Sequence, residues 1–254
     1  MYEEEFSKVD ELRHILARSR RVVFLGGAGT STESGIPDFR SKDGVFAAMR
    51  DYGYPPEVLL SHSFFLKHTE TFYDYYKKHL LYPNAIPNDC HRALAQMERE
   101  GLLAAVVTQN IDGLHQKAGS RTVFELHGSV YINHCMNCNR AYALQDILRK
   151  PGVPTCYCGG IIKPDVVLYE EPLNEKVLRP AIAQMDKADT LIIGGTSLAV
   201  YPAAGLVNYF HGRSLVVINL GSNSRTGSAT LNISAPIGQV LRKAVLNKTL
   251  AKEA

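Results

Sequence analysis

The chain lacks the features that would assign it to a membrane, secreted or nucleic-acid-binding class. It has no apolar run long enough to span a membrane, and its first residues, MYEEE, are acidic where a secretory signal would be basic. The net charge is only +3 over 254 residues, and Lys and Arg are scattered rather than gathered in one block. We therefore expect a cytoplasmic protein that binds neither membrane nor nucleic acid.

Cysteine is scarce and unevenly distributed. The chain holds five cysteines, and four of them form two short pairs: Cys135 with Cys138, and Cys156 with Cys158. In a reducing compartment this clustering indicates a metal site rather than disulfides. Four thiolates complete a tetrahedral zinc shell, so we predict one structural Zn²⁺. His134, beside the first pair, is then expected to be a bystander.

Two common enzyme signatures are also missing. There is no Gly-x-Ser-x-Gly, and the clustered cysteines are committed to metal, so a cofactor would have to supply the reactivity of any enzyme built on this chain. A glycine turn, Gly27 to Gly29, follows an apolar run that begins at Val22, but the next glycine is Gly35, too distant for the standard dinucleotide fingerprint. The turn fits either a pyrophosphate site, cradled by backbone N–H groups, or a plain tight turn.

Short apolar runs alternate with helical patterns along the chain. Strands are predicted at residues 22–25, 103–107, 123–126, 190–193 and 215–218, and helices at 6–21, 89–100, 175–188, 202–210 and 241–254. This alternation predicts an α/β fold in which helices cover both faces of a parallel sheet. Two segments break the pattern. Residues 41–86 are rich in aromatics and predict helices outside the sheet, and residues 129–165 predict a small metal-binding insertion.

Polar residues follow several of the predicted strands. Ligands bind outside the carboxyl ends of an open parallel sheet, so these positions are the first candidates for a site. His127 is the natural acid–base group, since an imidazole titrates near neutrality. Asn110 and Asp112 can hydrogen-bond hydroxyls or an amide, and Arg40 can pair with a phosphate. Each also has an ordinary structural interpretation. His127 could be a core histidine, the stretch with Asn110 and Asp112 could be a turn that satisfies its own backbone, and Arg40 could form a surface ion pair.

Six motifs occur in a fixed order: GAGTSTESGIPDFR, TQNIDGLHQKAG, ELHGSV, the paired cysteines, GGTSLAVYPAA and VINLG. With them the chain resembles the sirtuins of bacterial or archaeal type, the NAD-dependent protein lysine deacylases, over nearly its whole length. The resemblance implies a Rossmann-like large domain over about 1–40, 87–128 and 166–254. It also implies a small domain made from a helical insertion, about 41–86, and a zinc ribbon, about 129–165.

The resemblance further implies a set of site residues. His127 would be the general base and Asn110 a second catalytic residue. NAD would be held by Ala28, Thr32, Phe39, Arg40, Gln109, Ile111, Asp112, Thr196, Ser197, Asn219 and Ile237. The implied reaction moves an acyl group from a protein lysine to ADP-ribose and releases nicotinamide. The acyl-lysine peptide would add a strand near Val166-Val167 and Ala199-Val200.

Two departures from the family pattern bear on specificity. Where the family commonly reads Pro-x-Val-Val-x-Phe-Gly-Glu, residues 164–171 read PDVVLYEE, so Glu170 stands in place of a glycine. The Tyr-x-x-Arg of members that prefer acidic acyl groups is here Tyr73-Asp74-Tyr75-Tyr76. Without that arginine to pair a carboxylate, acetyl or longer neutral acyl groups are the expected substrates.

Two other functions use the same residues. A protein mono-ADP-ribosyltransferase would share the NAD pocket but transfer ADP-ribose to a protein nucleophile. A non-catalytic NAD-binding module would act through its zinc ribbon. The combination of His127 with the loop from Asn110 to Asp112 separates these alternatives from a deacylase, because a mere binder needs no such arrangement.

Overall fold

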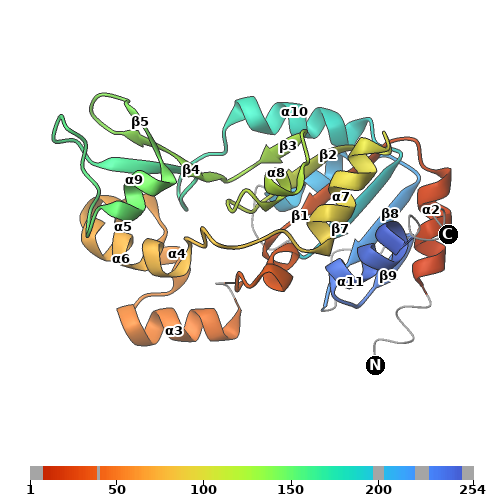
Figure 1. Ribbon diagram of the computed structural model, residues 1–254, viewed down its shortest axis with the longest axis horizontal. Coiled ribbons are helices and arrows are strands. Elements are labelled where there is room, and N and C mark those ends of the chain that lie inside the picture. The colour runs from red at the N-terminus through yellow and green to blue at the C-terminus, as the bar shows by residue number, and fades with distance from the viewer. Residues whose placement is uncertain (1–7, 39–40, 197–202, 221–228, 248–254) are drawn as a thin grey trace.

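The larger part of the molecule is a six-stranded parallel sheet. The computed structural model describes residues 8–38, 41–196, 203–220 and 229–247. Its main sheet has the strand order β3-β2-β1-β7-β8-β9 (Figure 1). The strands are β1 (Val22–Gly26), β2 (Leu103–Thr108), β3 (Val123–Glu125), β7 (Thr190–Gly194), β8 (Ser214–Ile218) and β9 (Leu231–Ile233). All neighbouring strands pair in parallel, so the predicted α/β class is confirmed.

Helices cover both faces of this sheet because its central strands, which are mostly apolar, are buried at every position. All five residues of β1 are buried, and so are all five of β7. Phe24 faces one core cluster and Leu25 the other. The first cluster packs against α2 (Val9–Arg18), α7 (Asp89–Arg99), α11 (Ile237–Leu241) and the π-helical turn η5 (Arg242–Leu246). The second packs against α10 (Glu175–Asp186) and η3 (Ala203–Tyr209).

A second unit lies at one end of the molecule, away from the main sheet (Figure 1). It holds a three-stranded antiparallel sheet in the order β5-β4-β6, formed by β4 (Gly128–Cys135), β5 (Ala141–Ala143) and β6 (Ile162–Val166), with α9 (Leu144–Arg149) after β5. Beside it are α3 (Lys42–Tyr52), α4 (Pro56–Leu59), α5 (His62–Lys67) and α6 (Thr69–His79). The core of this unit includes six buried aromatic side chains: Phe64, Phe65, Phe72, Tyr73, Tyr75 and Tyr76.

The structure differs from the sequence-based expectation in a few elements. The segment predicted as a helix at 202–210 is a 3₁₀ helix where it is described, and the short elements β9 and α8 (Leu114–Ala118) had no strong periodic signal. The closing helix begins at Ile237, earlier than predicted, and residues 248–254 lie outside the described part. No helix in the described ranges is both long and apolar enough to cross a bilayer.

A pair of buried histidines packs under the first strand. The rings of His91 (α7) and His115 (α8) lie 4.7 Å apart, and His115 also packs on Phe24. Neither ring nitrogen of His115 has a hydrogen-bond partner among the described residues. Burial lowers the pKa of His91 to about 4 and lowers the pKa of His115 well below its usual 6.5. Both imidazoles are therefore neutral in the folded protein.

We expect His115→Leu to make folding less sensitive to acid. The unfolded chain protonates this histidine near pH 6.5 and the folded chain does not, so its contribution to stability is present above pH 6.5 and lost as the pH falls. Below that pH the unfolding free energy of the wild type should lose up to about 1.4 kcal/mol per pH unit more than that of the variant. Urea unfolding between pH 7.5 and 5.5 measures the two slopes, and parallel slopes would contradict the expectation.

Candidate active site

A cavity of about 210 Å³ opens at the carboxyl ends of β1 and β2, where the main sheet meets the second unit. It is far larger than the space of one water molecule, so it can admit an organic group. Its walls come from the loop after β1, the loop after β2, His127, the segment that follows β6, and the end of α6 with the residues after it. The predicted site residues that line it are Ala28, Gln109, Asn110, Ile111, Asp112, His127, Val166 and Val167.

His127 sits between β3 and β4, with its ring at the cavity. The Nδ1 atom lies 3.0 Å from the backbone oxygen of Gln109. A carbonyl oxygen only accepts, so Nδ1 carries the proton and the neutral ring has its lone pair on Nε2. The chain can turn sharply here because the next residue is Gly128, with φ of 74°. A β-carbon at Gly128 would stand 1.8 Å from the backbone oxygen of Asp165, so only glycine fits.

The loop after β2 is fixed by hydrogen bonds to the loop after β1. Asn110 Nδ2 donates to Thr30 Oγ1 and Ser31 Oγ, both at 3.0 Å. Ser31 Oγ donates to Asp112 Oδ2 at 2.7 Å, and the Leu114 N–H donates to Asp112 Oδ1 at 2.9 Å. Asp112 is largely buried, and this burial raises the pKa of its carboxyl in spite of the hydrogen bonds. The amide and the carboxyl are thus held in one orientation at the cavity wall.

A second, half-buried carboxyl, that of Glu125, interacts with Asp112 of this loop. Burial, together with the charge of Asp112, raises the pKa of Glu125, the last residue of β3, to about 7. Its Oε1 atom has no hydrogen-bond partner among the described residues. The pKa values of the carboxyls of Asp112, at the cavity wall, and of Glu125, which does not line the cavity, are thus both raised.

The glycine turn packs tightly against the loop after β7. The N–H groups of Gly27 and Gly29 donate to the backbone oxygens of Gly194 and Gly195, at 3.3 and 2.8 Å. A β-carbon at Gly29 would stand 2.7 Å from the Cα of Gly195. Close backbone approach is therefore the reason for these glycines. Their N–H groups, which the sequence suggested as a phosphate cradle, are bonded within the protein.

The loop after β7 is held in turn by Asn219, at the end of β8. Its side chain makes two hydrogen bonds to Thr196, accepting from the N–H at 3.0 Å and donating to the carbonyl at 2.8 Å. Gln109 Nε2 donates to Thr196 Oγ1 at 3.3 Å. Three of the predicted NAD contacts are thus linked to one another across neighbouring strand ends.

The remaining predicted residues lie elsewhere or outside the described part. Thr32 is exposed and donates from Oγ1 to the Gly29 carbonyl, and the side chain of Ile237 is buried in the sheet core, so only its backbone could contact a ligand. Phe39, Arg40, Ser197, Ala199 and Val200 lie outside the described residues. Sequence reasoning did not single out Thr30, His79 or Tyr82, and His79 and Tyr82 line the cavity. Ser31, a polar residue after the first predicted strand, and Tyr76, from the stretch considered for acyl specificity, also line it.

The four clustered cysteines meet in the second unit. Their Sγ atoms all lie within 4.8 Å of one another, and two of the distances are 3.4 Å (Cys135 to Cys158) and 3.6 Å (Cys138 to Cys156). A tetrahedral zinc with bonds of about 2.3 Å separates its sulfurs by about 3.8 Å, so this set fits the ion. Tyr142 donates to Cys156 Sγ at 3.0 Å. His134 pairs with Asp165 at 2.8 Å and stays out of the cluster.

Comparison with known proteins agrees with this arrangement. The sequence profile of the Sir2 family matches residues 27–202. The chain belongs to the Sir2 family. An NAD-dependent protein deacetylase of Clostridium perfringens is 57% identical over 240 residues, which cover 94% of this chain and 98% of that protein.

Solved Sir2 structures share the fold of this Sir2 chain. One, described as Sir2 with a p53 peptide and NAD⁺, is 38% identical with a TM-score of 0.84 and covers 96% of this chain and 99% of its own. Another is a Sir2 variant with a deacetylated p53 peptide and 3′-O-acetyl-ADP-ribose. It is also 38% identical, with a TM-score of 0.85, and the match covers 92% of this chain and 96% of the other. The resemblance stated from the six motifs is confirmed.

We expect Gly160→Ala to weaken metal binding by this Sir2 protein. A β-carbon at Gly160 would stand 2.7 Å from Cys135 Sγ and 2.8 Å from Asn137 Cγ, so the thiolate must move. Displacing one ligand should lower zinc affinity about tenfold or more. Competition with a chromogenic chelator measures the zinc affinity. The matched control is Tyr157→Ala in the same turn, whose side chain is 91% exposed, and equal affinities for the two variants would contradict the expectation.

Proposed function

We propose that this protein is an NAD-dependent protein lysine deacylase that releases nicotinamide and O-acyl-ADP-ribose. The observation that carries the proposal is the hydrogen bond from His127 to the Gln109 carbonyl, which leaves the basic nitrogen of the neutral ring on Nε2 at a cavity lined by Asn110 and Asp112. The named activity of the Clostridium perfringens relative supports the same reaction. A non-catalytic binder has no need of an oriented imidazole.

In this proposal each polar group has a role set by its position. Bound NAD supplies an electrophilic ribose carbon and nicotinamide as a leaving group. His127 accepts a proton from a hydroxyl at Nε2, while its Nδ1–H stays on the Gln109 carbonyl and orients the ring. Asn110, Ile111 and Asp112 line the nicotinamide pocket. Their preset orientation reduces the entropic cost of aligning the reacting groups.

The remaining NAD contacts are proposed to come from the loop after β1 and from the ends of β2, β7 and β8. Gln109 lies near the ribose, and Ala28 and Thr32, with Phe39 and Arg40 outside the described part, belong to the cofactor loop. The adenosine half is assigned to Thr196, Ser197 and Asn219, with the backbone of Ile237. The hydrogen bonds among Gln109, Thr196 and Asn219 support this assignment, because they make one rigid rim from β2, β7 and β8.

We propose a structural Zn²⁺ held by Cys135, Cys138, Cys156 and Cys158, since all four tetrahedral positions are filled by protein. The metal holds the two turns of the ribbon together and takes no part in the reaction. The cysteines carry no disulfide, which suits the reducing cytoplasm as the location of the protein.

Two domains are proposed around the cavity. The large domain takes about 1–40, 87–128 and 166–254, and the small domain takes 41–86 and 129–165. Val166 and Leu168 pack in the aromatic cluster of the helical insertion, so the boundary near residue 166 lies at a contact between the two proposed domains. The acyl-lysine peptide is proposed to pair with the segment at Val166-Val167 and with Ala199-Val200, as a strand added between the domains.

The charges around the cavity favour neutral acyl groups. Asp112, Glu170 and Glu171 line it, and no Lys or Arg does so within the described ranges. At the position where acid-preferring members carry arginine stands Tyr76, whose side chain is fully buried and stacked on Phe72. A succinyl carboxylate would thus lose its hydration and meet negative charge without a compensating partner.

Incubation with an acetyl-lysine peptide and NAD tests the reaction. We expect nicotinamide release in step with peptide deacetylation and O-acetyl-ADP-ribose formation, and a 10²- to 10⁴-fold loss of rate, in order of magnitude, in His127→Ala. His14→Ala, on the exposed side of α2, is the matched control and should keep the wild-type rate. Transfer of ADP-ribose to protein without peptide would favour the transferase alternative, and absence of nicotinamide release would favour the binding module.

A matched pair of peptides tests the acyl preference. We expect kcat/KM for acetyl- or propionyl-lysine to exceed that for succinyl-lysine by about tenfold or more, which corresponds to about 1.4 kcal/mol of lost transition-state binding. Mass spectrometry of the same peptide sequence carrying each acyl group provides the measurement. Comparable turnover of the succinyl and acetyl forms would contradict the charge argument.

A further inference from the structure

Glu170 occupies a backbone conformation that usually belongs to glycine. Its φ is 76°, and it is one of two non-glycine residues with positive φ among those described. A side chain in this left-handed region is strained, which explains why glycine suits the position. A glutamate here needs a compensating interaction.

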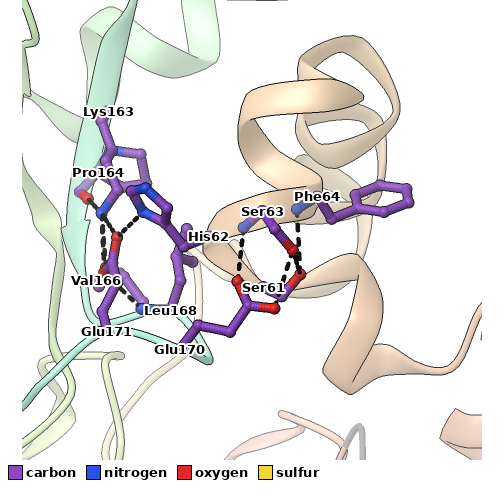
Figure 2. A network of polar contacts seen from close by, with 10 residues as sticks. All are labelled: Ser61, His62, Ser63, Phe64, Lys163, Pro164, Val166, Leu168, Glu170 and Glu171. Atoms are coloured by element: carbon purple, nitrogen blue, oxygen red, sulfur yellow. Dashed lines mark hydrogen bonds and ion pairs between the residues drawn. The ribbon is translucent and has the colours of Figure 1, made fainter.

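The compensation is a pair of hydrogen bonds to one residue of the helical insertion. Glu170 Oε2 accepts from the Ser63 N–H, and Glu170 Oε1 accepts from the Ser63 hydroxyl, both at 2.9 Å. Figure 2 shows the two carboxylate oxygens facing Ser63 at the beginning of α5. Both bonds gain strength from the charge of the acceptor. Glycine at position 170 would have no group to make them.

The adjoining residues attach the same turn to α5 and to β6. The Tyr169 N–H donates to the Leu60 carbonyl and the His62 N–H donates to the Tyr169 carbonyl, each at 3.0 Å. The Glu171 carboxylate lies 2.8 Å from His62 Nδ1 and 3.2 Å from Lys163 Nζ, and it accepts from the Leu168 N–H at 2.9 Å (Figure 2). Glu170 is thus the one side chain that joins the turn to Ser63.

This turn is also a wall of the candidate site. The six consecutive residues 166–171 all line the cavity, and Val167 at their start donates its N–H to the carbonyl of His127. Whatever holds residues 168–171 against α5 therefore sets the position of the wall.

We propose that Glu170 is a positioning residue for the peptide substrate. This inference rests on the proposed deacylase function. By fastening residues 168–171 to Ser63, the Glu170 carboxylate keeps the peptide-binding segment at 166–167 ordered before the peptide arrives, which lowers the conformational entropy lost on binding. Its oxygens bond Ser63, on the helical insertion, so the reacting groups at His127 stay in place when it is removed.

Three substitutions separate this role from a structural one. Glu170→Gly relieves the left-handed strain and removes the attachment, so the melting temperature should hold or rise while the KM for an acetyl-lysine peptide rises about five- to tenfold. Glu170→Gln keeps one oxygen acceptor and should restore part of the affinity. Ser63→Ala removes one of the two donors and should give an intermediate KM. In all three, kcat and the KM for NAD should stay within about twofold of wild type.

A direct measurement of peptide binding tests the role of Glu170 independently of turnover. Fluorescence anisotropy with a labelled acetyl-lysine peptide should show the same loss of affinity in Glu170→Gly. Glu175→Gln, an exposed acid on α10 paired with Arg179, is the matched control and should bind as the wild type does. Unchanged peptide KM and Kd in Glu170→Gly would overturn the inference, as would a fall in kcat equal to the rise in KM.

The two proposals fail differently. A wild type that binds the peptide but releases no nicotinamide contradicts the deacylase function, and the anisotropy comparison then still decides the role of Glu170. A wild type that deacetylates the peptide, with the same peptide KM and Kd in all three variants, contradicts the positioning role alone. A wild type that binds no acyl-lysine peptide overturns both.

Discussion

The contact between Gly128 and the backbone of Asp165 is the constraint on which the site depends. At this point the chain leaves the main sheet, turns in a left-handed conformation and enters the small antiparallel sheet, and there is no room for even one methyl group. The same turn orients His127, whose carbonyl accepts from the N–H of Val167, directly after β6. One short piece of backbone therefore sets the position of the imidazole and the spacing of the two units.

Around that turn the site is organised by hydrogen bonds between strand ends rather than by any single loop. Asn110 and Asp112 are tied to Ser31, and Asn219 is tied to Thr196, which also receives a bond from Gln109. Every one of these bonds joins residues far apart in the sequence. A parallel sheet brings them together because its carboxyl ends share one edge, and this gives a pre-ordered rim at the cavity.

A feature of this fold or site can be predicted from the sequence when the residues that cause it are close together along the chain. Runs of apolar residues predict the buried strands that begin at Val22 and Thr190. The spacing of the four cysteines predicts the metal site. The partner of Ser31 and the close approach behind Gly29 could not be read from neighbouring residues, since both depend on segments about 80 or more positions away. Glu170 was noted as a departure, but its left-handed backbone and its bond to Ser63 required the fold.

The strand β4 links the cavity to the cysteine cluster. It begins at Gly128, directly after the imidazole, and it ends at Cys135, the first thiol of the cluster. A single strand of eight residues therefore runs from the turn beside His127 to the cysteine cluster. Oxidation of Cys135 to a disulfide would change the surroundings of the end of the strand whose beginning orients the imidazole.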